Sequence, residues 1–409
     1  MKKVSDEGDE EATVRDSTNE ILRTIATSGP LSRAQLARDL GLSGPTLTQA
    51  TKYLLEKGLI AEVKQSPSTG GRPATLLGLV ANAGQVLGVK LADNHAVGVC
   101  VNLQSEVLWG FEEPFSSRGV DAVKELVALL KKQRRKIKGQ LLGIGIGIPG
   151  VVSPLDSGTA DSAMLGWSNE NVGKQISDAL NTPVLLENDV NTLAVAESLY
   201  GHGRDVSNFI TVTLGRGIGM GLVIHGELYA GSYGAGEFGH VNAVNGGALC
   251  ECGKHGCLET VASSPAIHAA AVAAGYISTS APMSHLWELA RGDSSIAEKL
   301  FSRPAELLGI ALANVLNVFG PELILISGEG VEGWDLWERQ FRASLSKHVV
   351  STMNKFEMEI DPWDDAKWAL GATAIVLQAS LSRSPRTNAS FTEVKNRLSI
   401  ASRPSMRVS

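Results

Sequence analysis

The feature that most constrains the fold is a plan of strands and helices that occurs twice along the chain. Alternating strands and helices are typical of α/β domains built on a mostly parallel sheet. The sequence therefore predicts a duplicated α/β domain. Its expected elements are paired strands at Val86–Leu91 and Ala96–Leu103, a helix at Val120–Lys136, strands at Leu141–Ile148 and Pro183–Leu186 and a helix at Asn191–Tyr200, then paired strands at Phe209–Leu214 and Gly221–Ile224, a helix at Ala305–Phe319 and a strand at Leu323–Ile326.

Glycine gathers in turns that follow these strands. It accounts for 44 of 409 residues, about 11% against roughly 7% in average proteins. Two turns are especially rich in it, at residues 214–221 and 327–330. Because α/β folds place ligand sites at strand ends, and because glycine lets backbone N–H groups approach a ligand, both turns are candidate binding loops.

Residues 17–80 predict a winged helix-turn-helix domain. A helix from Ser17 stops at Gly29, and Ser32 with Gln35 forms a capping box that starts a second, short helix. A tight turn at residues 41–43 leads to a third helix, and two strands follow as a wing. An ordinary three-helix domain is the alternative. The third helix is expected at Gly44–Lys57 and the wing strands at Leu59–Val63 and Thr75–Leu79.

The third helix would present small and hydrogen-bonding side chains outward, as base edges and phosphates require. Residues 18–75 carry seven basic and four acidic side chains, a net charge of +3 in a chain whose total is −6. Arg72 in Gly-Arg-Pro can enter a narrow minor groove, and an ordinary wing turn is the equal alternative. The predicted DNA-binding residues are Ser43, Pro45, Thr46, Thr48, Gln49, Lys52 and Arg72.

Three of the four cysteines lie within eight residues, close after a histidine. His240, Cys250, Cys252 and Cys257 form a Cys₃His set suited to tetrahedral zinc, with no open position for a catalytic water. The zinc is therefore expected to be structural. The alternatives are three unrelated cysteines, or His255 as the fourth ligand. Cys100 lies in an apolar strand and is expected in the core.

The termini and the charge limit the remaining classes. The net charge of −6 excludes a protein that coats nucleic acid over its whole surface. Residues 1–16 are expected to be a disordered acidic tail with no apolar signal segment, and residues 382–409 a flexible tail. The longest apolar stretch, at residues 141–152, is too short for a bilayer. A cytoplasmic protein without membrane contact is expected.

Together these motifs resemble the ROK family of bacterial repressors and sugar kinases. The resemblance covers residues 18–380 and rests on Glu237-Phe-Gly-His240, on Cys-x-Cys-Gly-x-x-Gly-Cys-x-Glu from Cys250 and on Glu187-Asn-Asp-Val-Asn191. Residues 42–60 and the wing entry resemble winged-helix repressors. The resemblance implies a two-lobed actin-like ATPase fold for residues 81–381, which would bind sugar and dimerise.

The resemblance also implies a set of sugar-binding residues. One ring nitrogen of His240 would face zinc and the other a sugar hydroxyl. For Asn188 and Asp189 the alternative is a turn with a helix cap. One departure is Ala163-Met-Leu165, where the family often has an asparagine. The implied sugar contacts are Asn188, Asp189, Glu237, His240 and Glu259.

Asp189 matches the general base of the family's kinases, but the ATP motif is degenerate. Where the kinases have Asp-x-Gly-Gly-Thr, this chain has Lys90-Leu-Ala92-Asp-Asn94, and Arg216 and Met220 replace smaller residues in the second phosphate loop. Losing the metal-binding carboxylate and the glycines hinders a site that works by positioning. The sequence thus predicts a sugar-responsive repressor without catalysis. An active sugar kinase with an added DNA-binding domain, or a module that senses a transport protein, is the alternative.

The resemblance further implies how the protein would act. A homodimer, or a tetramer of paired dimers, would place two winged helices on half-sites of double-stranded operator DNA. A sugar would change that binding through its differential affinity for two states. Lys90, a cation where kinases have an acidic group, leads to the hypothesis that the effector is a sugar phosphate.

Overall fold

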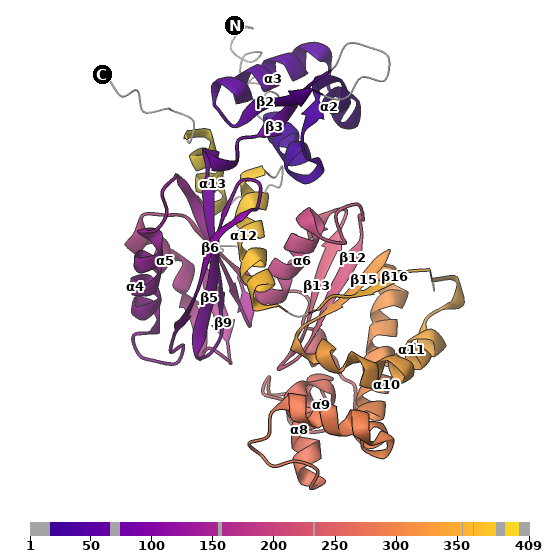
Figure 1. Cartoon of the computed structure of the whole chain (residues 1–409). Coiled ribbons are helices and arrows are strands. Elements are labelled where there is room, and N and C mark those ends of the chain that lie inside the picture. The colour runs from indigo at the N-terminus through magenta and orange to yellow at the C-terminus, as the bar shows by residue number, and fades with distance from the viewer. Residues whose placement is uncertain are drawn as a thin grey trace, which may run out of the picture. The chain divides into compact units, whose positions relative to one another are not determined.

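The chain divides into two compact units, residues 1–192 with 368–409 and residues 193–367 (Figure 1). The structure is a computed structural model that describes residues 17–65, 74–153, 158–231, 234–353, 355–362, 364–381 and 389–400. Each unit has its own five-stranded sheet and its own hydrophobic core. Within the described ranges, no helix has the length and apolar character needed to cross a membrane.

The N-terminal part of the first unit is a winged helix-turn-helix. A helix over residues 17–28 precedes β1 (Leu31–Ser32), α2 (Arg33–Leu40), α3 (Gly44–Glu56), β2 (Ile60–Gln65) and β3 (Thr75–Leu79), and the strands pair in the order β1-β3-β2. The predicted capping box of Ser32 and Gln35 is present. Ile21, Leu36, Leu54 and Leu77 are fully buried between the helices and the wing. The predicted domain is confirmed, and the short strand β1 is additional.

The sheet of the first unit has the strand order β11-β7-β4-β5-β6. β4 is parallel to β7, β7 is parallel to β11, and β5 is antiparallel to both β4 and β6. α4 and α5 contribute to the same apolar core as these strands. The elements are η1 (Ala81–Ala83), β4 (Gln85–Leu91), β5 (His95–Asn102), β6 (Val107–Pro114), α4 (Ala122–Arg134), β7 (Leu141–Ile148), the small sheet of β8 (Val151–Val152), β9 (Thr159–Ser162) and β10 (Trp167–Asn171), α5 (Val172–Leu180) and β11 (Val184–Asn188).

Two C-terminal helices complete this unit, α12 (Asp365–Leu381) and α13 (Ala389–Ile400). α12 lies so close to the sheet that a Cβ atom on Gly145 would be 1.7 Å from the carbonyl oxygen of Ala372. α13 buries Val394 completely, and Arg397 donates from Nη2 to the carbonyl oxygen of Asn181 at 2.8 Å. Residues 389–400 are therefore an ordered helix, which the expectation of a flexible tail from residue 382 did not include.

The second unit repeats the topology of the first sheet. Its strand order is β14-β13-β12-β15-β16, with β13 antiparallel to β12, β15 parallel to β12 and β16 parallel to β15. β12 thus corresponds to β4, and the predicted duplication is confirmed. The strands are β12 (Phe209–Leu214), β13 (Ile218–Ile224), β14 (Glu227–Leu228), β15 (Leu323–Ser327) and β16 (Glu357–Ile360).

The helices of this unit from residue 238 onward contribute to one large core that includes Leu286, Phe301, Ile324 and Phe341. They are η2 (Phe238–His240), α7 (Glu259–Ala262), α8 (Ser264–Ala273), α9 (Met283–Gly292), α10 (Ser294–Phe319), η3 (Glu329–Gly333), α11 (Trp334–His348) and η4 (Ser351–Met353). The unit also contains most of α6 (Asp189–Tyr200), which begins in the first unit. Most predicted boundaries of the α/β part differ from the structure by about two residues at most, and two are wrong by more. α10 begins at Ser294 rather than at Ala305 because Pro304 lies inside the helix, and β13 begins at Ile218 rather than at Gly221.

Candidate functional site

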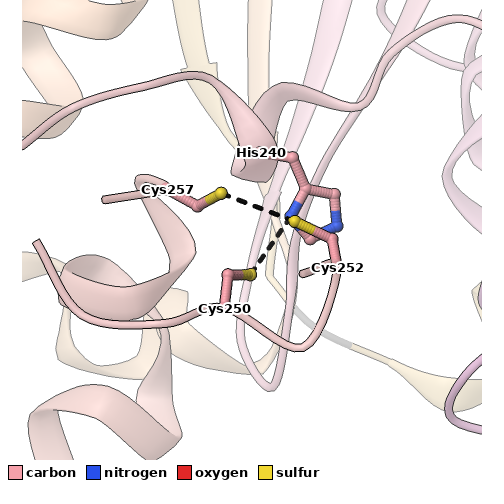
Figure 2. Close-up of side chains that lie close together, drawn as sticks. All are labelled: His240, Cys250, Cys252 and Cys257. Atoms are coloured by element: carbon pink, nitrogen blue, oxygen red, sulfur yellow. Dashed lines mark hydrogen bonds between the residues drawn. The ribbon is translucent and has the colours of Figure 1, made fainter. Parts of the chain in front are cut away.

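One histidine and three cysteines of the second unit come together in a compact group (Figure 2). Their ligand atoms all lie within 4.8 Å of one another. Cys250 Sγ is 3.5 Å from His240 Nδ1, and Cys252 Sγ is 3.6 Å from Cys257 Sγ. A tetrahedral zinc site with Zn–S bonds of about 2.3 Å has sulfur–sulfur edges of roughly 3.8 Å. These four residues, the ones predicted, can therefore hold a metal ion.

The loop that carries the cysteines depends on glycine. Gly253 and Gly256 have φ values of +83° and +76°, and a Cβ atom on Gly256 would be 1.8 Å from the carbonyl oxygen of Val244. The Cys250 N–H donates to the Lys254 carbonyl oxygen at 2.8 Å, which closes the turn. These contacts bring the three thiols to one side of a short segment.

The other two residues considered as ligands lie elsewhere. His255 is exposed, and its Nδ1 is 3.1 Å from the carbonyl oxygen of Gly247. Cys100 is fully buried in β5, where burial raises the pKa of its thiol to about 12. Cys100 lies outside the group of four ligand atoms, as expected of a core residue.

Three of the predicted sugar-binding residues flank the metal-binding group. His240 points Nδ1 toward Cys250, while its Nε2 is 3.7 Å from a carboxylate oxygen of Glu237, an exposed residue. Glu259 begins α7 two residues after Cys257, and its Oε2 accepts the N–H of Ile218 at 2.9 Å. One Glu259 oxygen is therefore held by the protein backbone.

The other two predicted sugar residues, Asn188 and Asp189, lie in the first unit, at the junction of β11 and α6. Asn188 Oδ1 accepts the N–H groups of Val190 and Asn191, and its Nδ2 donates to the carbonyl oxygen of Gly150 at 2.9 Å. Asn188 therefore caps the start of α6, which was the alternative weighed for this motif. The five predicted sugar-binding residues therefore form two sets. Asn188 and Asp189 lie in the first unit, and Glu237, His240 and Glu259 lie in the second.

Six of the seven predicted DNA-binding residues lie in α3 or at its N-cap. Ser43 caps the helix, accepting the Thr46 N–H at 3.3 Å. Thr48 Oγ1 donates back to the carbonyl oxygen of Gly44 at 2.8 Å. Pro45, Thr48, Gln49 and Lys52 are exposed, as predicted, while Leu47 and Leu54 are buried. Arg72 lies outside the described residues.

The degenerate first phosphate turn has a definite structure. Lys90, in β4, places its ammonium group 4.3 Å from the centre of the Trp368 ring, in a cation–π contact. Ala92 donates its N–H to the carbonyl oxygen of His95 at 2.9 Å, so this backbone donor closes the β4–β5 turn.

The glycine turn after β12 contacts Glu329, a residue that the sequence did not predict to belong to a site. Because β13 starts at Ile218, the turn consists of residues 215–217 only, and Met220 is buried in the strand. The Arg216 N–H donates to Oε1 of Glu329 at 2.6 Å. The signal available in the sequence was an acidic residue between Gly328 and Gly330, directly after a buried strand.

Comparison with known proteins extends over most of the chain. The ROK family model matches residues 90–379, and the MarR family model matches residues 18–68. The xylose repressor of Caldicellulosiruptor bescii is 29% identical over 384 residues, covering 88% of this chain and 95% of that protein. The DNA-binding transcriptional dual regulator NagC of Escherichia coli K12 is 28% identical over 375 residues, covering 88% and 92%.

Solved structures share the fold. A ROK family transcriptional regulator described as a homolog of the E. coli MLC protein has a TM-score of 0.79 at 24% identity, and the match covers 95% of this chain and 99% of that one. A ROK family glucokinase from Streptomyces griseus has a TM-score of 0.62 at 24% identity, covering 71% and 99%. With the family model spanning residues 90–379, this chain belongs to the ROK family.

Proposed function

We propose that this protein is a DNA-binding transcriptional repressor of genes for carbohydrate uptake or catabolism, controlled by a sugar or sugar phosphate. The observation that carries the proposal is that one chain contains both a winged helix-turn-helix and a ROK region. The N-terminal half of α3 in the winged helix-turn-helix presents exposed polar residues. Relatives named as a xylose repressor and an N-acetylglucosamine repressor match both parts, since each match covers 88% of the chain.

In this proposal α3 and the wing bind operator DNA, with contacts from Ser43, Pro45, Thr46, Thr48, Gln49, Lys52 and Arg72. The N-terminus of α3 has backbone N–H groups and small hydroxyl side chains, which suit phosphate contacts. A homodimer would present two such helices to two half-sites. Arg72 would insert into the minor groove beside each half-site.

The sugar would contact Asn188, Asp189, Glu237, His240 and Glu259. Their carboxylates, amide and imidazole can pair with neighbouring hydroxyl groups, and an unpaired partner is costly enough to discriminate between sugars. A structural zinc ion on His240, Cys250, Cys252 and Cys257 would fix the loop from which two of these groups project.

The function is tested by an electrophoretic mobility shift on DNA from upstream of the protein's own gene, with a panel of sugars and sugar phosphates. We expect specific binding, and a change in affinity of about 5- to 150-fold with one ligand, because coupling energies are typically about 1–3 kcal/mol. A random duplex of equal length is the control. Equal affinity for both duplexes would contradict the proposal.

Catalysis is not part of the proposed function. The kinases' metal-binding carboxylate is replaced by Lys90, whose charge lies over Trp368, and the Ala92 N–H is used within the β4–β5 turn. We therefore expect no sugar-dependent ATP turnover above background in a coupled assay. Turnover that disappears in Asp189→Ala would establish the kinase alternative.

A further inference from the structure

The glycine turn at residues 215–217 and the first residue of β13 after it donate N–H groups to two carboxylates of the protein. Glu329, from η3, accepts the N–H of Arg216 at 2.6 Å. Glu259, from α7, accepts the N–H of Ile218 at 2.9 Å. Backbone N–H groups in glycine-rich turns are the donors that hold phosphate groups in many proteins. In this chain, carboxylate oxygens of the protein accept hydrogen bonds from N–H groups of this kind.

Glu329 packs directly on the glycine. A Cβ atom on Gly215 would be 2.2 Å from Cδ of Glu329, so a larger residue here would displace the carboxylate. On the other side, Gly328 and Gly330 allow η3 to start next to the backbone of Leu214. Glu329 is half-buried. Three glycines thus hold one carboxylate against the turn.

A pocket of about 300 Å³ adjoins this contact within the second unit. Glu329 and Arg216 line it together with Ser264, Pro265, His268, Met283 and Trp287. Pro265, Met283 and Trp287 provide apolar walls, and His268 Nε2 is 2.7 Å from the carbonyl oxygen of Ala281. The pocket therefore suits an apolar or planar group, while the Glu329 carboxylate repels an anion at the turn.

We propose that Glu329 is a specificity-determining residue that closes the glycine turn to phosphate groups, so that the adjoining pocket admits ligands without phosphate and excludes phosphorylated ones. A phosphate would compete with the carboxylate for the Arg216 N–H and would be repelled by its charge. The inference concerns residues 215–217 and η3 alone, and it does not depend on DNA binding or on the sugar.

The test is a calorimetric titration of the full-length protein with ADP, comparing wild type with Glu329→Ala. The substitution removes the carboxylate that accepts the Arg216 N–H and would compete with a phosphate oxygen for it. We expect ADP affinity to rise at least tenfold. Glu332→Ala is the matched control, because Glu332 is an exposed carboxylate on the same helical turn. It should bind ADP as wild type does.

The proposal is overturned if wild type binds ADP as tightly as Glu329→Ala does, when the Glu329→Ala variant keeps the wild-type unfolding midpoint. It is also overturned if Glu332→Ala gains as much ADP affinity as Glu329→Ala. If Glu329→Ala does not fold, Glu329→Gln decides, because it keeps the volume and removes the charge. That variant should bind ADP at least threefold more tightly than wild type, and a smaller gain refutes the proposal.

Discussion

Substituting Cys252 with serine is expected to abolish zinc binding and to destabilise the second unit by at least about 3 kcal/mol. That loss is a small part of the roughly 10–16 kcal/mol by which structural zinc binds zinc-finger peptides. A serine hydroxyl does not ionise near neutral pH, so it cannot replace the thiolate beside Cys257, 3.6 Å away. Metal content per chain and the thermal unfolding midpoint measure the effect.

The matched control for this prediction is Cys100→Ala. Cys100 is the one cysteine outside the group, buried in β5, and its removal should leave the zinc content at one ion per chain. The midpoint of the Cys252→Ser variant should fall by about 6–12 °C, at 2–4 °C per kcal/mol for a unit of this size. A variant that loses zinc and keeps the wild-type midpoint, DNA binding and sugar response would show that the metal has no structural role.

The duplicated sheet could be predicted because its central strands are continuous apolar runs. All eight residues of β7 are buried, and so are all residues of β12 and β15. β6 was missed because it is an edge strand whose residues alternate between exposed and half-buried. α10 was predicted too short because an interior proline is ordinarily a helix stop, whereas Pro304 here is buried inside the helix.

Site residues that are close in sequence could be predicted, and contacts between residues far apart in sequence could not. The metal-binding group was predictable because three of its residues lie within eight positions, and His240 lies only ten before Cys250. The contact of Glu329 with Arg216 spans 113 positions, and that of Glu259 with Ile218 spans 41. Neither follows from a local pattern. The first depends on the pairing of β12 with β15, and the second on the contact of α7 with the start of β13.

Asn188 has the structural role that was the alternative interpretation of its sequence motif. Its Oδ1 caps α6, while its Nδ2 binds the Gly150 carbonyl oxygen. The cap holds the start of α6, where Asp189 lies, and so determines the backbone position of the next predicted sugar residue. A structural role for Asn188 is therefore part of how the proposed sugar site would be built.

Two substitutions on the exposed face of α3 should separate base recognition from phosphate contact. Gln49→Ala is expected to relax operator specificity at one base pair, because a glutamine amide pairs with adenine through two hydrogen bonds worth about 1–3 kcal/mol of discrimination. Gln49 is exposed and lies one turn into the helix. Competition among operator duplexes with single base-pair changes measures the loss.

Lys52→Ala is expected to weaken all duplexes equally. The Lys52 side chain is 75% exposed, and its Nζ lies 3.9 Å from Oε1 of Glu56. Such an exposed ion pair is weak, so the Lys52 ammonium group can contact a DNA phosphate instead. Removing one phosphate contact should lower the slope of log affinity against log salt by about 0.9 for each α3 bound. If Lys52→Ala changed base preference, or Gln49→Ala weakened every duplex alike, α3 would lie on the DNA in a different orientation from the one proposed.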